Sequence, residues 1–376
     1  MKKLIILTAL AFTAVAAMAM AAYAATGWTT VSVPSTGNNV ILSGASARTN
    51  SDAWAVGQQF VGAGKPPAPA VAYHWTGTGW SLVPTPSLTG QYGALRAVSA
   101  SGAGDAWAVG FAMIPGNDDS DGTLIEHWNG SAWSVNSIDA FVGFAAGLNG
   151  VVDLSPTNAW AVGRGRGGGL LLHWNGSAWS QVTLPDSAFT PASGNAISAD
   201  SASDIWVVGN TVNATGASVP EALHYNGTTW TVVAVPEPSR SSGTLSAVTA
   251  VSPGNVWAVG EASGAGSAIG GGTLTEHWNG GAWSVVASPT PGAYPSLNGV
   301  AARSANDVYA VGTNLPSING GPEHGFILRW NGSAWSVDSN GAFAGELFAA
   351  ATFPGAANEW AAGVNGGNQG SVLSHG

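Results

Sequence analysis

Short apolar segments separated by turn residues recur along the chain after residue 24, and they mark two repeated elements. The first joins an aspartate or asparagine to an apolar stretch with one aromatic residue and a glycine, as in Asp105–Gly110. The second joins a histidine and an aromatic residue to an Asn-Gly turn and a tryptophan, as in His127–Trp133. Copies of the first begin 46 to 53 residues apart, at Asp52, Asp105, Asn158, Asp204, Asn255, Asp307 and Asn358. Copies of the second, some with small changes, begin at His74, His127, His173, His224, His277 and Arg329.

Each repeated unit is expected to form four short β-strands. An Asn-Gly pair between two apolar segments is a strong hairpin signal, so the second element predicts the third and fourth strands. The first element predicts the second strand, and a short apolar run before it, such as residues 95–100, predicts the first. After residue 24 the sequence shows no helical periodicity. Four-stranded units repeated at this interval are typical of the blades of a β-propeller.

The two ends of the repeated region complement each other. The seventh unit stops at Gly376 after three expected strands, whereas residues 27–31 have the sequence of a fourth strand with no third strand before it. We therefore expect the N-terminal strand to complete the last blade and close the ring, which removes free sheet edges. The sequence thus predicts an all-β fold, a seven-bladed β-propeller with four-stranded blades, formed by a single domain over residues 25–376.

The repeat resembles the kelch repeat, the unit of galactose-oxidase-type propellers, in a secreted bacterial form. The resemblance rests on a glycine that ends the second strand, an aromatic residue that ends the third and a tryptophan that opens the fourth, over about residues 26–376. A kelch repeat has two glycines after the second strand, whereas Gly110, Gly260 and Gly312 stand alone. The resemblance implies the propeller fold. Galactose oxidase activity would need a cysteine-tyrosine cofactor, and the chain has no cysteine.

The first 24 residues have the features of a signal peptide. Lys2 and Lys3 precede an apolar run, and Ala22-Tyr23-Ala24 has the small-x-small form of a cleavage site. The length of the apolar run leaves a membrane anchor as the alternative. We expect a secreted or cell-surface protein that has no membrane insertion after signal cleavage.

Charge and cysteine content narrow the classes of partner. Only 8% of the residues are charged, and 20 acidic residues outnumber 10 basic ones. Such a chain repels nucleic acid and anionic lipid, so neither is expected as a partner. The absence of cysteine excludes disulfides and thiolate metal sites, so the core must come from packing, to which 18 tryptophans can contribute. We expect a monomer.

The repeated histidines and tryptophans are expected to be structural. The second and third strands of a blade run antiparallel, which places the aspartate that opens one strand beside the histidine that ends the other. We therefore expect bonds such as Asp52 to His74 and Asp105 to His127, and we place His375 at the same repeat position. The regularly spaced tryptophans are expected to pack between blades.

The binding surface is predicted on one face of the ring. The first-to-second and third-to-fourth strand turns are short and alike, whereas the other two loops of each unit differ and emerge on the opposite face. Individual loops on a rigid scaffold are common binding sites. The candidate ligand-binding residues on this face are Tyr92, Phe144, Phe189, Tyr294, Phe343, Arg164 and Arg166. The alternative is that the aromatic rings plug the central channel, and that the arginines neutralise nearby acids.

One segment is a candidate calcium site. Residues 117–122 resemble the first half of an EF-hand-type loop, with Asn117, Asp119 and Asp121 as oxygen ligands. The twelfth position is Trp128 rather than glutamate, so another loop would have to donate a ligand. Ca²⁺ is the one cofactor that the sequence suggests, and a solvated polar loop is the alternative.

The sequence has no catalytic motif. Seven acids on the variable face could supply a pair for glycan cleavage, and nothing in the sequence selects two of them: Asp139, Asp186, Glu221, Glu237, Glu261, Glu323 and Glu346. We therefore predict a binding module that recognises extracellular carbohydrate through its variable loops. The alternatives are a cell-surface or matrix scaffold that binds another protein, which the low-charge exterior favours, and a glycan-active hydrolase or lyase.

Overall fold

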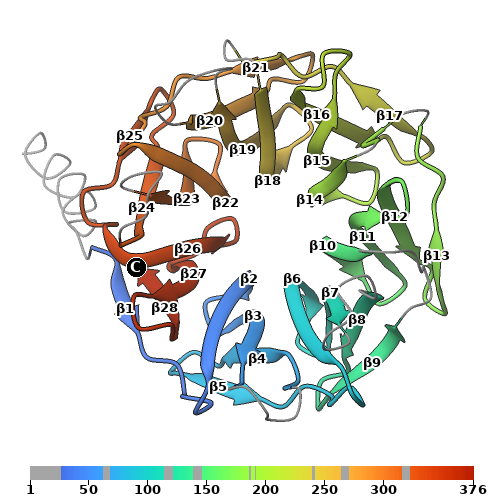
Figure 1. Cartoon of the computed structure of the whole chain (residues 1–376), viewed down its shortest axis with the longest axis vertical. Coiled ribbons are helices and arrows are strands. Elements are labelled where there is room, and N and C mark those ends of the chain that lie inside the picture. Colours follow the sequence, from blue (N-terminus) through green and yellow to red (C-terminus); the bar gives the residue numbers. More distant parts are fainter. Residues whose placement is uncertain are drawn as a thin grey trace, which may run out of the picture.

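The chain forms a ring of β-sheets around a central opening (Figure 1). The computed structural model describes residues 27–61, 68–113, 122–138, 146–185, 188–190, 192–238, 242–263, 271–315 and 322–376. All regular secondary structure in these residues is β. They include no helix with the length and hydropathy needed to cross a bilayer. The predicted signal peptide, residues 1–24, lies outside the described residues.

Five antiparallel sheets of the described chain contain four strands each, in sequence order. Strands β2 to β5 are Asn39–Thr49, Asp52–Phe60, Val71–Trp75 and Trp80–Val83. Strands β6 to β9 are Tyr92–Gly102, Asp105–Met113, Gly122–Trp128 and Trp133–Ile138. Strands β10 to β13 are Gly147–Ser155, Asn158–Gly165, Gly168–Trp174 and Trp179–Gln181. Strands β14 to β17 are Ser193–Ser201, Asp204–Val212, Ser218–Tyr225 and Trp230–Val233. Strands β18 to β21 are Ser242–Ser252, Asn255–Ser263, Gly272–Trp278 and Trp283–Val285.

The other described strands form one eight-stranded sheet. They are β1 (Thr29–Val31), β22 (Tyr294–Ser304), β23 (Asp307–Leu315), β24 (His324–Trp330), β25 (Trp335–Val337), β26 (Phe343–Ala351), β27 (Glu359–Asn365) and β28 (Gly370–His375). Strands β22 to β25 form a first group, and β26, β27, β28 and β1 form a second group. The two groups join through the pairing of β24 with β26. In the second group, β1 pairs antiparallel with β28, and Thr30 lies opposite Leu373. The predicted pairing of the N-terminal strand with the last strand is therefore confirmed.

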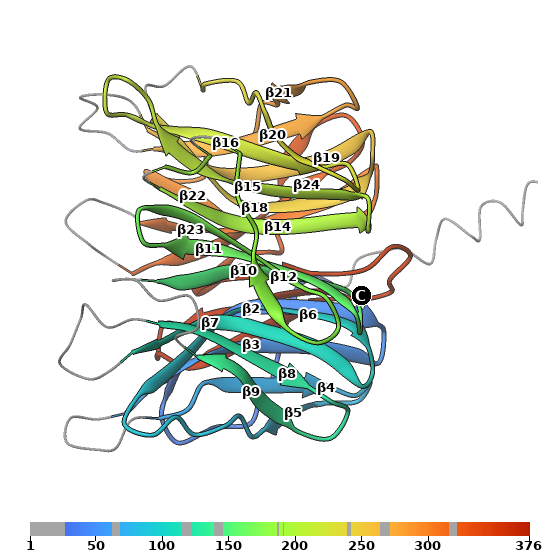
Figure 2. The ribbon, with the colours of Figure 1, turned by 90° about the vertical axis from the view of Figure 1, so that its right-hand side faces the viewer.

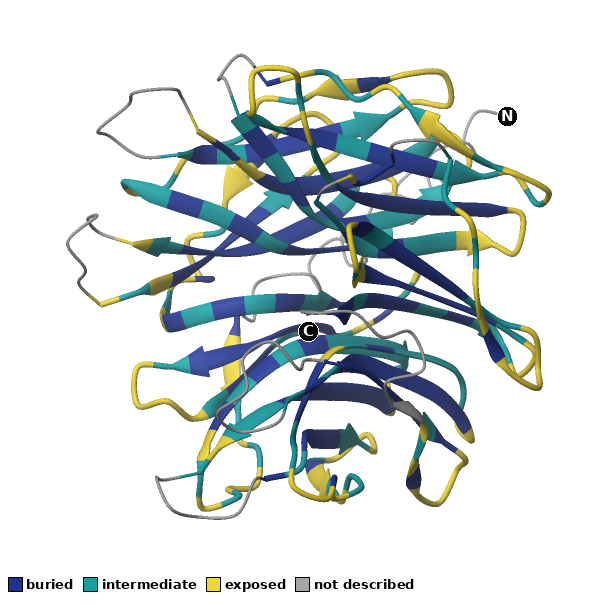
Figure 3. Ribbon diagram, turned by 45° about the vertical axis from the view of Figure 1, so that its right-hand side comes forward, coloured by how far each residue is buried: buried dark blue, intermediate teal, exposed yellow. Residues whose placement is uncertain are grey.

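The second strand of each unit is buried on both faces because the sheets stand side by side around the ring (Figure 2). In β7, every residue from Asp105 to Gly110 is buried. Ala108 packs in the cluster with the sheet on one side, and Trp107 and Val109 pack in the cluster on the other. Alternate residues of a strand point to opposite faces, so an unbroken apolar run fits a strand between two sheets. The outer strands and the turns are more exposed (Figure 3).

An aromatic residue from each second strand fills the space between neighbouring sheets, which we call a seam. Trp107 lies edge-on against Trp179 of the next sheet, with ring centroids 5.0 Å apart at 87°. The same arrangement recurs in the pairs Trp54–Trp133, Trp160–Trp230, Trp206–Trp283, Trp257–Trp335 and Trp360–Trp80. In the remaining seam Tyr309 packs against Trp28, 5.4 Å between centroids. The expected packing role of these tryptophans is confirmed.

The repeated histidines bond to the residue that opens the second strand of their own sheet. The Nε2 atoms of His74 and His127 lie 2.8 and 2.7 Å from Asp52 Oδ1 and Asp105 Oδ1, as the sequence predicts. His224 bonds to Asp204 in the same way, whereas His173 and His277 bond to Asn158 and Asn255. Most of these rings also stack on the second-strand tryptophan, for example His74 on Trp54 with centroids 4.1 Å apart.

His375 does not occupy the predicted repeat position. Ser374 lies opposite Trp360, so His375 is one residue beyond the place of the other histidines. Its Nδ1 atom lies 3.1 Å from Oε2 of Glu359, a fully buried carboxylate. Arg329, which replaces the histidine of the sixth unit, bonds to both Glu359 at 3.0 Å and Asp307 at 2.6 Å. An ion-pair cluster therefore holds the last two units together where the histidine pattern breaks.

Trp28→Ala is expected to lower the free energy of unfolding by about 3–5 kcal/mol, because it leaves a cavity beside Tyr309 in the closing seam. It also removes the hydrogen bond from Nε1 to Asp338, 3.2 Å long. Val337→Ala is the matched control, because its side chain is 46% exposed on neighbouring β25 and should cost less than about 1 kcal/mol. Chemical denaturation measures both, and equal losses would contradict a core role for Trp28.

Candidate functional site on the loop-rich face

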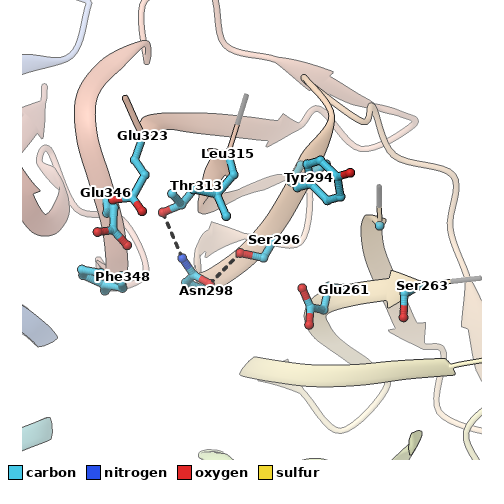
Figure 4. A pocket seen from close by; sticks show the side chains of 12 residues that line it. Glu261, Ser263, Tyr294, Ser296, Asn298, Thr313, Leu315, Glu323, Glu346 and Phe348 are labelled. Atoms are coloured by element: carbon cyan, nitrogen blue, oxygen red, sulfur yellow. Dashed lines mark hydrogen bonds between the residues drawn. The ribbon is translucent and has the colours of Figure 1, made fainter. Parts of the chain in front are cut away.

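A cavity of about 470 Å³ opens on the face predicted to bind ligands. It lies where β19 and β23 end and where β22, β24 and β26 begin, so residues from neighbouring units surround it (Figure 4). Its wall combines three carboxyl groups, two aromatic rings and small polar groups: Glu261, Glu323, Glu346, Tyr294, Phe348, Ser263, Ser296, Asn298 and Thr313. The variable face therefore has a concave site that mixes aromatic and hydrogen-bonding side chains.

A β-bulge places Asn298 at the floor of this cavity. The register of β22 against β23 shifts between Leu297 and Gly299, and a bulge re-aims the side chain of the extra residue. The Asn298 amide nitrogen donates to the Leu347 carbonyl at 2.8 Å and to Thr313 Oγ1 at 3.3 Å. Its carbonyl oxygen accepts a hydrogen bond from Ser296 Oγ at 3.2 Å. These contacts hold the amide in one orientation before any ligand arrives.

The same bulge occurs in the first strand of every unit and lines the central channel. The bulged residues are Ser43, Arg96, Asn149, Asn195, Ser246, Asn298 and Phe348. All seven line a channel cavity of about 170 Å³, and Asn298 and Phe348 also line the larger cavity. The candidate site therefore borders the central channel.

Two carboxyl groups of the cavity, those of Glu323 and Glu346, lie beside each other (Figure 4). The backbone N–H of Gly345 donates to the Glu323 carbonyl at 3.1 Å, which brings the start of β24 beside Glu346 of β26. Burial, followed by the hydrogen bond and the charge of Glu323, raises the pKa of the Glu346 carboxyl to about 7. Glu346 therefore keeps its proton to a higher pH than an exposed glutamate does. None of the described residues that line the cavity is a lysine, arginine or histidine, so the site has acidic character.

The aromatic rings complete the chemistry of the cavity. Tyr294 opens β22, and its backbone N–H donates to Asn314 Oδ1 at 3.2 Å. Both Tyr294 and Phe348 are half-buried, so part of each ring faces the cavity. Ligand sites typically combine apolar surface with a few fixed polar groups. This arrangement can accept a ligand that offers an apolar face together with several hydrogen-bond donors. Among the described residues no group of three acidic or histidine side chains is placed to hold a metal ion.

The structure distributes the other predicted site residues around the same face. Tyr92 opens β6 and Phe343 opens β26, and both are half-buried outside the cavity wall. Arg164 is exposed at the end of β11. Arg166 lines a second cavity of about 620 Å³ with Thr183 and Thr190. The structure therefore brings Tyr294 into the candidate site and does not gather the other residues there.

The prediction that Phe189 exposes its ring to ligands is wrong. Its side chain is fully buried in the seam between the sheets of β10–β13 and β14–β17. The backbone turns inward there with a φ of 53°, and its N–H donates to the Glu221 carboxylate. Gly209 leaves room for the ring, because a Cβ added to it would lie 3.1 Å from Phe189 Cε1. The ring therefore contributes to the core.

Several candidates from the sequence lie outside the described residues. They are the calcium-loop residues Asn117, Asp119 and Asp121, the aromatic residue Phe144, and the acids Asp139 and Asp186. Sequence reasoning did not select Asn298 or Phe348, nor the pairing of Glu323 with Glu346. One signal was available for the first two: they occupy the repeat position after the first-strand leucine, where the residue type changes from unit to unit. The carboxyl pair depends on the contact between β24 and β26, which the repeat does not predict.

No protein-family model and no curated protein sequence matches the chain. Solved structures match its fold over almost the whole length. YCF48 bound to D1 peptide is similar with a TM-score of 0.58 at 15% identity, over 93% of this chain and 97% of that one. YCF48 from Cyanidioschyzon merolae gives 0.57 at 16% identity, over 93% and 98%. An ulvan lyase of polysaccharide lyase family PL25, bound to -[GlcA(1-4)Rha3S]-, gives 0.57 at 10% identity, over 92% and 95%. These likenesses support a β-propeller fold.

Glu323→Gln is expected to lower the pKa of Glu346 from about 7, because it removes the neighbouring carboxyl charge. Burial should keep the value above that of an exposed glutamate. Carboxyl ¹³C NMR titration measures the change. Glu261→Gln is the control, since Glu261 lines the same cavity from β19 and should leave the pKa of Glu346 unchanged. An unchanged pKa in Glu323→Gln would contradict the interaction between the two carboxyl groups.

Proposed function

We propose that this protein is a secreted β-propeller binding module that recognises extracellular carbohydrate in the cavity beside Tyr294. The observation that supports it is one concave site, on the individual loops, that combines aromatic rings with a fixed amide and three carboxyl groups. Sugar rings present apolar faces that stack on aromatic side chains and hydroxyls that donate to carboxylate and amide oxygens. The low charge and the predicted signal peptide at residues 1–24 agree with an extracellular, monomeric protein.

We further propose that the ring has seven blades built from a kelch-like repeat with a single glycine. Two observations support seven: the eight-stranded sheet divides into two groups of four at the β24–β26 pairing, and seven bulged first strands line the channel. Tyr92, Phe343, Arg164 and Arg166 would extend the binding face beyond the cavity. The Asn117, Asp119 and Asp121 loop is proposed to add Ca²⁺ to that face.

Two alternatives have a specific observation in their favour. A basic segment of another protein would complement the acidic cavity, which favours a protein-binding scaffold. Two neighbouring carboxyl groups, one of which has a pKa raised to about 7, can supply an acid and a base at one place, which favours a glycan-active enzyme. The first predicts binding of a basic peptide and no glycan, and the second predicts cleaved products rather than a stable complex.

Tyr294→Ala is expected to weaken binding of the best glycan by about tenfold or more, equivalent to about 1.4 kcal/mol, because a stacking surface is lost. A glycan array with calcium and with chelator identifies the ligand, and calorimetry then compares the variants. Leu82→Ala is the control, since this side chain is 41% exposed on outer strand β5, away from the cavity. If no glycan binds, either with calcium or with chelator, the proposal is contradicted. If binding is lost only with chelator, the calcium loop is implicated.

A further inference from the structure

Two glutamates are fully buried in the seams between sheets, and neither has a hydrogen-bond partner among the described residues for its carboxyl oxygens. Glu126 on β8 and Glu276 on β20 are 0% exposed. In the described structure none of their four carboxyl oxygens has a hydrogen-bond partner. Glu126 lies opposite Ala108, in the seam between β2–β5 and β6–β9. Glu276 lies opposite Ala258, in the seam between β14–β17 and β18–β21.

The repeat shows what this position normally contains. In each unit one residue of the third strand lies opposite the aromatic residue of the second strand. The position discussed here is the residue immediately before it. The other units have an apolar or aromatic residue there: Tyr73, Leu172, Leu223, Leu328 and Leu373. The tyrosine hydroxyl donates to the Pro34 carbonyl at 2.8 Å, so it has a partner. Leucine therefore fits this space in the same fold, and packing alone does not require a carboxyl group.

Among the described residues no cation compensates these two carboxyl groups. The titratable residues on the strands that pack against β8 are Tyr92, Arg96, Asp105 and Asp153, and those on β2, β3 and β4 across the seam are Arg48, Asp52, Tyr73 and His74. The basic groups among them bond elsewhere: Arg96 to Asn149, and Arg48 and His74 to Asp52.

The surroundings of β20 are similar. The titratable residues on its packed strands are Glu261, Tyr294 and Arg303, and those on β14, β15 and β16 across the seam are Asp200, Asp204, Glu221, His224 and Tyr225. Arg303 pairs with Asp307 and Glu359, and His224 bonds to Asp204. Burial alone raises the pKa of Glu126 and of Glu276 to about 8.

We propose that protonated Glu126 and Glu276 make these two seams pH-sensitive, so that the propeller is most stable in an acidic medium and loosens as the pH rises. A buried carboxylate without a partner is costly, so the folded protein keeps the proton. The unfolded chain loses that proton near the ordinary glutamate pKa of 4.5. Between this pH and about 8, the folded state binds one more proton per glutamate than the unfolded state. Each group therefore multiplies the unfolding constant by about ten per pH unit.

Other groups modify this profile without reversing its sign. Burial raises the pKa of Asp153 to about 7, and that of Glu346 also stands at about 7, so both add to the loss of stability with rising pH. The pKa values of His173 and His277 are lowered by burial, so these two groups oppose the trend as the pH falls below about 6.5. The pKa of Asp52 is lowered, so this group changes the stability only at pH values near or below its ordinary pKa of 3.8.

The test compares the wild-type protein with the double variant Glu126→Leu and Glu276→Leu by chemical denaturation from pH 5 to pH 8. The leucines restore the residue that four other units have at this position. The unfolding constant of the wild-type protein should rise with pH. In the double variant the factor by which this constant rises per pH unit should be about a hundredfold smaller. Glu237→Gln is the matched control, since this side chain is exposed and its replacement should leave the slope unchanged. Equal slopes in wild type and double variant would overturn the proposal.

A second measurement begins with the wild-type protein, and this part of it does not require any variant to fold. Infrared spectroscopy of the folded wild-type protein at pH 7 should show absorption of protonated carboxylic acid, which ionises only at higher pH. The band should lose intensity in Glu126→Leu and Glu276→Leu taken singly, and not in Glu237→Gln. Fully ionised carboxylates in the wild type at pH 7 would overturn the proposal, whatever the stability of the variants.

Discussion

The ring depends on the burial of one aromatic side chain per seam. A four-stranded sheet of this length, with few charges and no disulfide, has little stability alone. Each second-strand tryptophan is covered by aromatic rings of the next sheet, and a histidine of its own sheet packs against it where the repeat provides one. A side chain that buries about 200 Å² stabilises a fold by about 5 kcal/mol. Because each seam needs both sheets, every sheet is ordered by its neighbours.

This constraint also decides where variation is possible. The histidine bonds and Asn-Gly turns occupy one face of the ring, where they fix each hairpin and leave little freedom. At the other face the strands extend beyond the seam, and their ends enclose the cavity of Glu323, Glu346 and Tyr294. The bulges in the first strands turn one side chain per unit toward the central channel. Asn149, Asn195 and Asn298 use that position to bond to the next unit, whereas Phe348 offers an apolar surface instead.

Much of the fold follows from the sequence because each local feature occurs several times in the repeat. The hairpin turns, the bonds of Asp52 and Asp105 to histidine, and the pairing of β1 with β28 were predictable, since each follows from periodicity and antiparallel geometry. The prediction failed where a unit departs from the repeat. Phe189 looked like a loop residue, but glycines beneath it make room for the ring in the core. His375 matched the pattern in composition and missed it by one residue of register. The carboxyl pair arises from a contact between units, which no single repeat contains.

The pairing of β1 with β28 gives the ring a second connection between its ends, made of hydrogen bonds rather than peptide bonds. Thr29 lies opposite Ser374, and Trp28 packs against Tyr309 beside them. A single cut in a loop between two other sheets would therefore not release a fragment, since the seams and this strand pair would still hold the pieces. Backbone continuity at any one loop between sheets is thus less important to this protein than the completeness of its circle of aromatic contacts.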